Sequence, residues 1–211
     1  MNAYKKELID ALVLPAFDRL NVSEKLLSSL YESCTLHQAV KFQLLELPGP
    51  YDDGRLWFSF EAMVQAYYFC PYRQCKWGTR IWRRREFILN SSSLLNHEFR
   101  TDYIEVLEPG DLLSITYVDL LKLMVEFPEL EKQVQSIAAS NERYYRNRTQ
   151  LLNRPALERV QEFERENSLF VNIAGKDAIA MHVGLTRQGY HNQLKKNMES
   201  PLNRSFENEI N

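Results

Sequence analysis

The chain has 211 residues and a formal net charge of −2 at pH 7, with 45% hydrophobic and 26% charged residues. This length allows one large domain or two small ones, and the composition is that of a soluble globular protein without the apolar run of about 18 residues that a membrane-spanning helix needs. The charge gives no overall attraction to nucleic acid, so any DNA binding has to come from a local basic surface.

The first 30 residues place leucine and phenylalanine side chains at helical spacing. Pro15 interrupts this run, and Ser23 is placed to cap a second helix that begins at Glu24. The start of the chain contains Glu7 and Asp10 and no small-residue cleavage site, so we predict no signal peptide and expect a cytoplasmic protein. The apolar positions of the run are Leu8, Leu12, Phe17, Leu20, Leu26, Leu27 and Leu30.

From Thr35 the pattern changes to short segments rich in aromatic and β-branched residues. They are TLHQAVKFQLLEL, RLWFSF, AMVQAYYF, TRIWRRREFIL, TDYIEVL and DLLSIT, separated by the turn-like segments PGPYDDG, CPYRQCKWG, NSSSLLN and EPGD. Short strands at this spacing predict a β-sandwich or a barrel-like β-roll. The three arginines of WRRRE are expected to alternate between solvent and edge positions of a strand, the alternative being a basic strip that faces a ligand or partner.

The cysteines and histidines show no catalytic or metal-binding pattern. Cys34, Cys70 and Cys75 lack a CxxC pair, which is typical of reduced cytosolic thiols. The segment CPYRQC is expected to form the tip of a hairpin, with a redox role as the alternative. His182 is expected to face solvent or to be packed. Because the sequence also has no phosphate-binding glycine loop, nucleophile elbow or zinc-protease motif, we expect no enzyme, no metal and no other cofactor.

From Val118 onward the pattern is helical, with Asp119 as a candidate cap and Pro128 as a break. The next helix has seven residues at alternating steps of four and three, the a/d spacing of a coiled coil. This spacing predicts a dimerisation helix, in which Asn141 would fix the register and Arg148 would weaken the seam. The alternative is a helix that packs on its own β-domain, with Asn141 and Arg148 reaching solvent. The expected dimer contacts are Leu130, Val134, Ile137, Asn141, Tyr144 and Leu151.

The segment DAIAMHVGLTRQGYHNQLKKN, Asp177 to Asn197, has the pattern of a helix-turn-helix. Ala180 and Gly184 supply the small residue and the turn, and Thr186 is placed to cap the second helix. No acidic residue occurs between Arg187 and Met198. We expect Arg187, Gln188, His191 and Asn192 to reach base edges and Lys195 and Lys196 to contact phosphates.

Two residues of this segment count against DNA binding and favour an ordinary pair of packing helices. Gly189 falls inside the second helix, where glycine costs about 1 kcal/mol relative to alanine. Gln193 occupies a position where an apolar side chain would pack better, so Leu194 would have to serve instead.

The order of these parts resembles the Crp/Fnr family of bacterial transcription regulators, most closely its divergent Bacteroidetes-type branch. The resemblance covers about residues 20–198 and rests on AMVQAYYF, on TDYIEVLEPGDLLSITYVDLLKLMVEFPEL and on AIAMHVGLTRQGYHNQLKK. It implies an α+β fold with a cyclic-nucleotide-binding-like β-roll and flanking helices over residues 1–128. A dimerisation helix over 129–153 and a helix-turn-helix domain over 154–211 would follow.

The resemblance also assigns roles to single residues of the C-terminal segment. Family positions that contact bases or phosphates fall on Thr186, Arg187, Gln188 and Asn192. Arg187 agrees with the frequent residue, whereas Gln188 stands where Glu is frequent and Asn192 where Arg is frequent. The preferred DNA sequence should therefore differ from the usual half-site. The tail MESPLNRSFENEIN has no strand-like alternation, so we expect the family's wing to be absent.

Ligand sensing in the family depends on a Gly-Glu pair followed by an arginine that holds the cyclic phosphate. Arg100 stands where this arginine would be, but Asn90 and Ser91 replace the Gly-Glu pair. We therefore expect no tight cyclic-nucleotide binding, an unidentified effector if there is one, and, as the alternative for Arg100, a surface ion pair. Three cysteines are too few for a four-cysteine iron–sulfur cluster in one chain.

Two functions follow from the sequence. The first is a homodimeric transcription regulator that binds a near-palindromic operator through its helix-turn-helix. The alternative is a ligand- or partner-binding protein of the same fold that has lost specific DNA binding.

Overall fold

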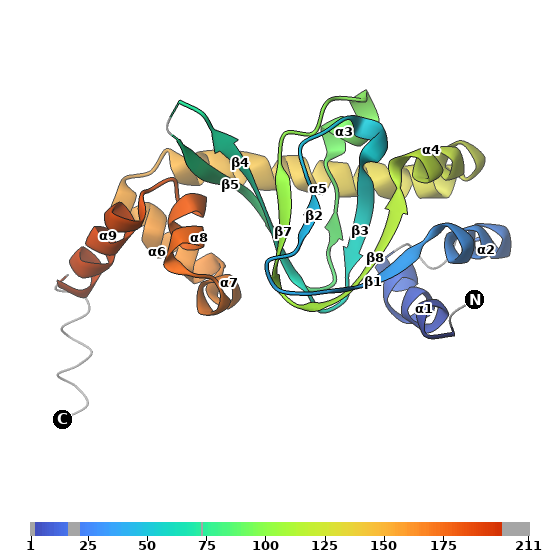
Figure 1. Cartoon of the computed structure of the whole chain (residues 1–211), viewed down its shortest axis with the longest axis horizontal. Helices are drawn as coiled ribbons and strands as arrows, with labels where there is room; N and C mark the ends of the chain where they lie inside the picture. Colours follow the sequence, from blue (N-terminus) through green and yellow to red (C-terminus); the bar gives the residue numbers. More distant parts are fainter. Residues whose placement is uncertain (1–2, 17–21, 73, 200–211) are drawn as a thin grey trace. The chain divides into compact units, whose positions relative to one another are not determined.

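The computed structural model describes residues 3–16, 22–72 and 74–199 (Figure 1). The chain forms two compact units, which we call unit 1 (Met1–Ala66 and Ile81–Arg143) and unit 2 (Tyr67–Arg80 and Tyr144–Asn211). No helix within the described ranges combines the length and the apolar character needed to cross a membrane.

Unit 1 begins with short helices. They are α1 (Ala3–Leu8), η1 (Ile9–Val13), η2 (Leu14–Ala16) and α2 (Glu24–Ser33). The hydroxyl of Ser23 accepts a hydrogen bond from the backbone N–H of Leu26 at 3.1 Å, which confirms the predicted cap of α2. Phe17 and Leu20 of the predicted apolar run lie outside the described residues.

The described strands form two four-stranded sheets, in the orders β1-β8-β3-β6 and β2-β7-β4-β5, and the parts of β4 and β5 between Tyr67 and Arg80 belong to unit 2. The strands are β1 (Thr35–Ala39), β2 (Leu44–Glu46), β3 (Arg55–Ser59), β4 (Met63–Cys70), β5 (Cys75–Trp82), β6 (Phe87–Ile88), β7 (Tyr103–Glu108) and β8 (Gly110–Thr116). Strand β8 is antiparallel to both β1 and β3, with Ser114 opposite Thr35 and opposite Trp57. The predicted β-sandwich is confirmed.

Two details of the predicted sheet are wrong. Strand β5 ends at Trp82, so the arginines at 83–85 lie in a turn, where Arg85 has a φ of 64°. The segment predicted as the turn NSSSLLN contains helix α3 (Ser91–Asn96), because the side chain of Asn90 accepts the N–H of Ser93 and caps it. A 3₁₀ turn, η4 (Tyr51–Asp53), precedes β3.

The described part of unit 1 has two hydrophobic clusters. One lies between the two sheets and contains Trp57, Val64, Trp82 and Val106. The other lies between the β1-β8-β3-β6 sheet and the helices α2, α4 (Tyr117–Glu126) and α5 (Pro128–Leu152), and residues from all three helices belong to it. Figure 1 shows α5 running along the roll.

Helix α4 is capped one turn earlier than predicted. Its N-cap is Thr116, whose hydroxyl accepts the N–H of Asp119 at 3.1 Å. Asp119, the predicted cap, instead sits in the first turn, where bonds from Thr116 and Lys122 lower the pKa of its carboxyl.

Unit 2 combines the tip of the β4–β5 hairpin, the end of α5 and four further helices. These are α6 (Ala156–Glu166), α7 (Ser168–Ile173), α8 (Lys176–His182) and α9 (Arg187–Glu199). Pro155 immediately precedes α6. The buried side chains of the helices include Val160, Phe163, Phe170 and Ile179, so unit 2 has a small core of its own.

Candidate nucleic-acid interface

A four-residue turn, 183–186, joins α8 to α9. Gly184 has a φ of +66°, a conformation that costs other residues energy, and the N–H of Leu185 bonds to the carbonyl of Ala180 at 2.9 Å. Ile179 and Tyr190 are buried on either side of this turn. The predicted small residue and glycine turn therefore lie where the sequence places them.

Helix α9 begins at the predicted cap. The hydroxyl of Thr186 accepts the backbone N–H of Gly189 at 3.0 Å. Gly189 therefore lies in the first turn of α9 and supplies the capping N–H, so the predicted penalty for a glycine in a helix interior applies only in part.

The predicted DNA-contacting residues share one side of α9. Arg187, Gln188, Asn192, Lys195 and Lys196 are exposed, as is Thr186 before them, and His191 is half-buried. Since residues three and four apart lie on one side of a helix, these side chains form a continuous stripe. We call this stripe the α9 face.

Two weak interactions hold the α9 face in the free chain. Arg187 Nη1 lies 3.3 Å from Asp177 Oδ2, with both side chains about 70% exposed. Gln188 donates a hydrogen bond to Asn192 at 3.0 Å. Exposed pairs of this kind contribute little stability, so a ligand could replace them at small cost.

The opposite side of α9 packs on α6. Tyr190 is buried and its hydroxyl donates to the carboxylate of Glu164, while Gln161 donates to Asn197 at 2.7 Å. Gln193 and Leu194 are both half-buried, so Leu194 supplies only part of the apolar contact expected of it in place of Gln193. These contacts fix which side of α9 remains exposed.

The hairpin tip meets the α8–α9 turn closely. A Cβ on Gly78 would lie 2.4 Å from the ring of His182, and a Cβ on Gly184 would lie 2.9 Å from the ring of Trp77. Arg148, at the end of α5, donates to the carbonyl of His182 at 2.7 Å and to the carbonyl of Gly78. We call the residues of these contacts the Arg148 clasp; they are Trp77, Gly78, Arg148, His182 and Gly184. An indirect signal for these contacts is the glycine at position 78, within a strand, because a glycine there often marks a close backbone approach.

His182 lies at the centre of unit 2. Its ring is fully buried and stacks against Phe163 and edge-on against Phe170. Burial and the nearby guanidinium of Arg148 hold the pKa of His182 well below its ordinary value. Of the two alternatives for this residue, the packed one is correct.

The stability of unit 2 should therefore depend on pH. In the unfolded chain a histidine takes up a proton near pH 6.5, whereas the folded chain keeps His182 neutral, so the contribution of His182 is present above that pH and is lost as the pH falls below it. We expect the free energy of unfolding to fall by about 1.4 kcal/mol for each pH unit below this point. Urea denaturation between pH 7.5 and about pH 5 measures the slope.

Two variants isolate the contribution of His182. His182→Gln should remove this part of the pH dependence, whereas His191→Gln should retain it. Burial also lowers the pKa of His37. This residue is present in both variants, so its contribution to the pH dependence is the same in each. Equal slopes for the wild type and His182→Gln would contradict the assignment.

In the roll, Arg100 is already engaged by the protein. Its Nη1 lies 2.8 Å from Glu46 Oε2 and its Nε donates to the carbonyl of Pro50, with both ionic side chains almost fully buried. Glu46 also accepts the indole N–H of Trp57 at 2.8 Å. Burial raises the pKa of Glu46, and the bonds from Trp57 and Arg100 oppose this rise. The predicted surface ion pair of Arg100 is in fact a buried one.

The spaced residues of α5 are used within the chain. Leu130 and Val134 belong to the core of unit 1, and Asn141 donates to the carbonyl of Leu89 at 3.0 Å and to the hydroxyl of Ser91 at 2.9 Å. Ile137 packs against the same core. The seam therefore covers the roll, and a second copy would have to contact other side chains of α5. The expectation that Asn141 and Arg148 reach solvent is wrong.

The last predicted dimer contacts lie in unit 2. The guanidinium of Arg80 lies 4.4 Å above the ring of Tyr144, and Leu151 is half-buried. Tyr144 thus already has a partner within the chain, and the dimer remains a prediction.

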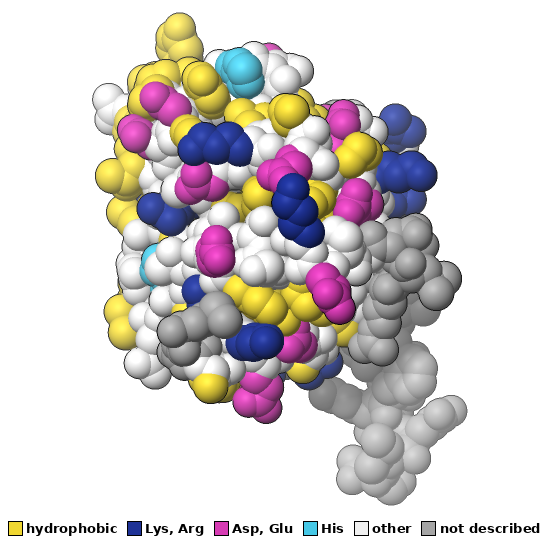
Figure 2. Space-filling model, turned by 90° about the vertical axis from the view of Figure 1, so that its right-hand side faces the viewer, with side chains coloured by type: hydrophobic (Ala, Val, Ile, Leu, Met, Phe, Trp, Pro, Cys, Tyr) yellow, Lys and Arg dark blue, Asp and Glu magenta, His cyan; other side chains and the backbone are white. Residues whose placement is uncertain are grey.

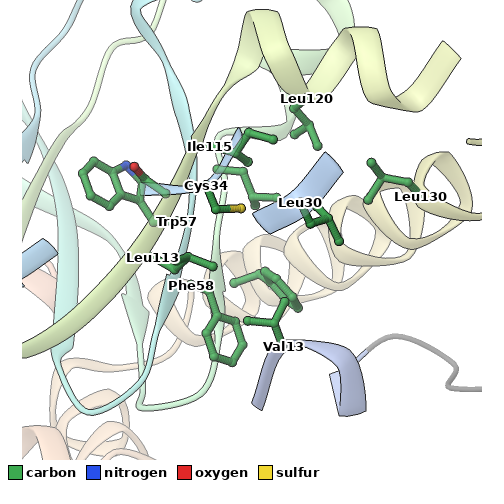
Figure 3. A pocket seen from close by; sticks show the side chains of 12 residues that line it. Val13, Leu30, Cys34, Trp57, Phe58, Leu113, Ile115, Leu120 and Leu130 are labelled. Atoms are coloured by element: carbon green, nitrogen blue, oxygen red, sulfur yellow. The ribbon is translucent and has the colours of Figure 1, made fainter. Parts of the chain in front are cut away.

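A cavity of about 30 Å³ lies in the core of unit 1 (Figure 3). Leu30, Cys34, Ile115 and Leu130 are among its lining residues. Burial raises the pKa of the Cys34 thiol to about 12, so this group stays neutral. An apolar cavity of this size remains dry and is too small for a nucleotide.

The expected absence of a wing concerns residues 198–211, of which Met198 and Glu199 end α9 and 200–211 lie outside the described part of the chain. Among residues 3–16, 22–72 and 74–199, no three His, Cys, Asp or Glu side chains are grouped to hold a metal ion.

The sequence matches no protein-family model and no curated protein. Solved structures are similar in fold. One, described as a Crp/Fnr-family transcriptional regulator from Eubacterium rectale, has a TM-score of 0.73 at 14% identity over 86% of this chain and 87% of that one. The c-di-GMP-responsive global regulator CLP of Xanthomonas campestris has a TM-score of 0.67 at 13% identity over 82% and 90%. FixK2 of Bradyrhizobium japonicum has a TM-score of 0.63 at 15% identity over 77% and 83%. The chain thus has the Crp/Fnr fold.

Proposed function

From a chain with the Crp/Fnr fold, we propose a DNA-binding transcription regulator of the cytoplasm in which α8 and α9 are a helix-turn-helix. The observation that carries the proposal is the α9 face: a capped helix with three cations, two side-chain amides and no acid between Arg187 and Met198. By contrast, on the face of unit 1 seen in Figure 2, Lys and Arg side chains are interspersed with Asp and Glu. A local basic surface is what a chain of net charge −2 needs to bind DNA.

Each residue of the α9 face has a distinct part in the proposal. Arg187 would pair with guanine, and Gln188 and Asn192 would pair with adenine once their mutual hydrogen bond opens. Thr186 and His191 would lie beside these contacts. Lys195 and Lys196, near the end of α9, would anchor phosphates.

We further propose a homodimer, with the dimer contact on the exposed side of α5 and the C-terminal domain over residues 154–211. Two copies of α9 about 34 Å apart would read a near-palindromic operator. The roll, over 1–128, would sense a signal and pass it through the helix at 129–153. A cyclic nucleotide is a poor candidate for that signal, because Arg100 is neutralised by Glu46.

Selection of the full-length protein against a random duplex DNA library tests the proposal. We expect enrichment of a two-fold-related motif, and loss of about 1–3 kcal/mol of binding free energy with changed base preference in Arg187→Ala. Lys195→Ala should weaken binding to all sequences and reduce the salt slope by about one. Lys41→Ala, an exposed lysine of the roll, is the matched control and should change neither.

The second candidate is a partner-binding protein that has lost DNA recognition. It is favoured by the pairing of Arg187 with Asp177 and of Gln188 with Asn192. The side chains that would read bases thus already have hydrogen-bond partners within the chain. Absence of any enriched motif, together with binding that does not respond to salt, would support this candidate over the first.

A further inference from the structure

Two cysteines flank the tip of the β4–β5 hairpin. Strand β4 ends at Cys70, β5 begins at Cys75, and the two strands are neighbours in the sheet. Residues 71–74 connect them, and Gln74 has a φ of 48° as expected in a tight turn. The two cysteines are therefore the last strand residues on either side of the turn.

Contacts of the neighbouring residues show which side of the hairpin the cysteines share. Lys76 Nζ donates to the hydroxyl of Tyr67 at 3.2 Å and lies 4.3 Å above its ring, so these two side chains are on one side. Because side chains alternate along a strand, Cys70 and Cys75 are both on the other side. In a regular hairpin the two strand residues that flank a four-residue turn are opposed, and opposed residues of antiparallel strands have Cα atoms about 4.5–5.5 Å apart, which lies within the range of disulfides.

The two thiols are also accessible, unlike the third. Cys75 is exposed and Cys70 half-buried, whereas Cys34 is buried with its pKa raised to about 12. Thiol–disulfide exchange needs an accessible thiolate, so the reagent can reach the hairpin pair but not Cys34.

We propose that Cys70 and Cys75 are a reversible disulfide site whose oxidant is a low-molecular-weight disulfide such as glutathione disulfide. One thiolate attacks the glutathione disulfide, forms a mixed disulfide and releases one glutathione thiolate. The second thiolate attacks the protein sulfur of the mixed disulfide, forms the Cys70–Cys75 bond and releases the second glutathione. Two protein thiols are oxidised, one glutathione disulfide is reduced to two glutathiones, and the two protein protons end on them.

Oxidation would act on the strand that forms the Arg148 clasp. Trp77 and Gly78 follow Cys75 by two and three residues and pack against Gly184 and His182. A covalent link at the tip limits the motion of this strand, so the oxidised hairpin should exchange its backbone amides more slowly. The proposal does not depend on DNA binding.

The test equilibrates the full-length protein in buffers of varied glutathione to glutathione-disulfide ratio, followed by acid quenching, alkylation and peptide mass mapping. We expect loss of both hairpin thiols in a single step, with Cys34 alkylated only after unfolding. Cys70→Ser and Cys75→Ser should each hold one glutathione instead, and Cys34→Ser should behave as the wild type.

Three outcomes would overturn the proposal. They are separate glutathione adducts on Cys70 and Cys75 without an internal bond, a disulfide between two chains, and thiols that stay alkylatable at every ratio. Hydrogen exchange of residues 69–78 provides a second readout, and we expect slower exchange in the oxidised wild type and no change in Cys70→Ser.

Discussion

Replacement of Glu46 by alanine is expected to lower the free energy of unfolding of unit 1 by about 3–5 kcal/mol. Glu46 and Arg100 are 4% and 6% exposed at their side chains, so the variant leaves a guanidinium buried without its counter-charge. The indole N–H of Trp57 loses its acceptor as well. Urea denaturation followed by tryptophan fluorescence measures the loss.

A surface ion pair of the same unit provides the control. Arg84 and Glu108 lie 2.7 Å apart, but Arg84 is 59% exposed, so Glu108→Ala should cost less than about 1 kcal/mol. Replacing Glu46 and Arg100 together by leucine and methionine should cost much less than Glu46→Ala, because no charge then remains buried. If Glu46→Ala and Glu108→Ala cost the same, Glu46 does not hold Arg100, and the argument against a cyclic-nucleotide signal loses its basis.

Gly78→Ala is expected to destabilise unit 2 by about 2–3 kcal/mol. The added Cβ would lie 2.4–2.6 Å from three ring atoms of His182, and this ring is fully buried and packed against Phe163 and Phe170. Neither the strand nor the ring can move without breaking the Arg148 clasp. Thermal or urea denaturation with near-ultraviolet circular dichroism reports the effect.

A matched glycine and a double variant make the Gly78 prediction specific. Gly175 has no atom within 4 Å of an added Cβ, so Gly175→Ala should cost less than about 1 kcal/mol. His182→Ala removes the ring, and in its presence Gly78→Ala should cost much less than in the wild type. Costs that simply add in the double variant would show that the hairpin does not meet His182.

Local features of the helices could be predicted because they depend on residues close in sequence. Ser23 and Thr186 cap their helices through an N–H three residues ahead. Gly184 supplies the positive φ of the α8–α9 turn. The exposed side of α9 also follows from the helical period. Tyr190 is buried, so the side of the helix that carries it packs inward and the other side is exposed. The β-sandwich followed from short strands separated by turns.

The partners of buried polar residues could not be predicted in the same way. Asn141 looked like a residue for pairing two chains, but it bonds to Leu89 and Ser91, some 50 positions away. Arg100 looked like a ligand contact or a surface group, but it pairs with the buried Glu46, 54 positions away in the chain. Each of these bonds joins segments that only the folded chain brings together.

The sequence by itself therefore determined the α+β class, the caps at Ser23 and Thr186 and the side of α9 that stays exposed, because a cap, a turn or a periodic face is decided within a few residues. Tertiary structure alone decided what each face meets. Apolar residues at a/d spacing can pack equally well against a second helix or against a sheet. Because the roll belongs to the same chain, it is always available to α5 and covers these residues. The contact of Gly78 with His182 likewise depends on the approach of a strand to a helix turn that are about a hundred residues apart in the chain.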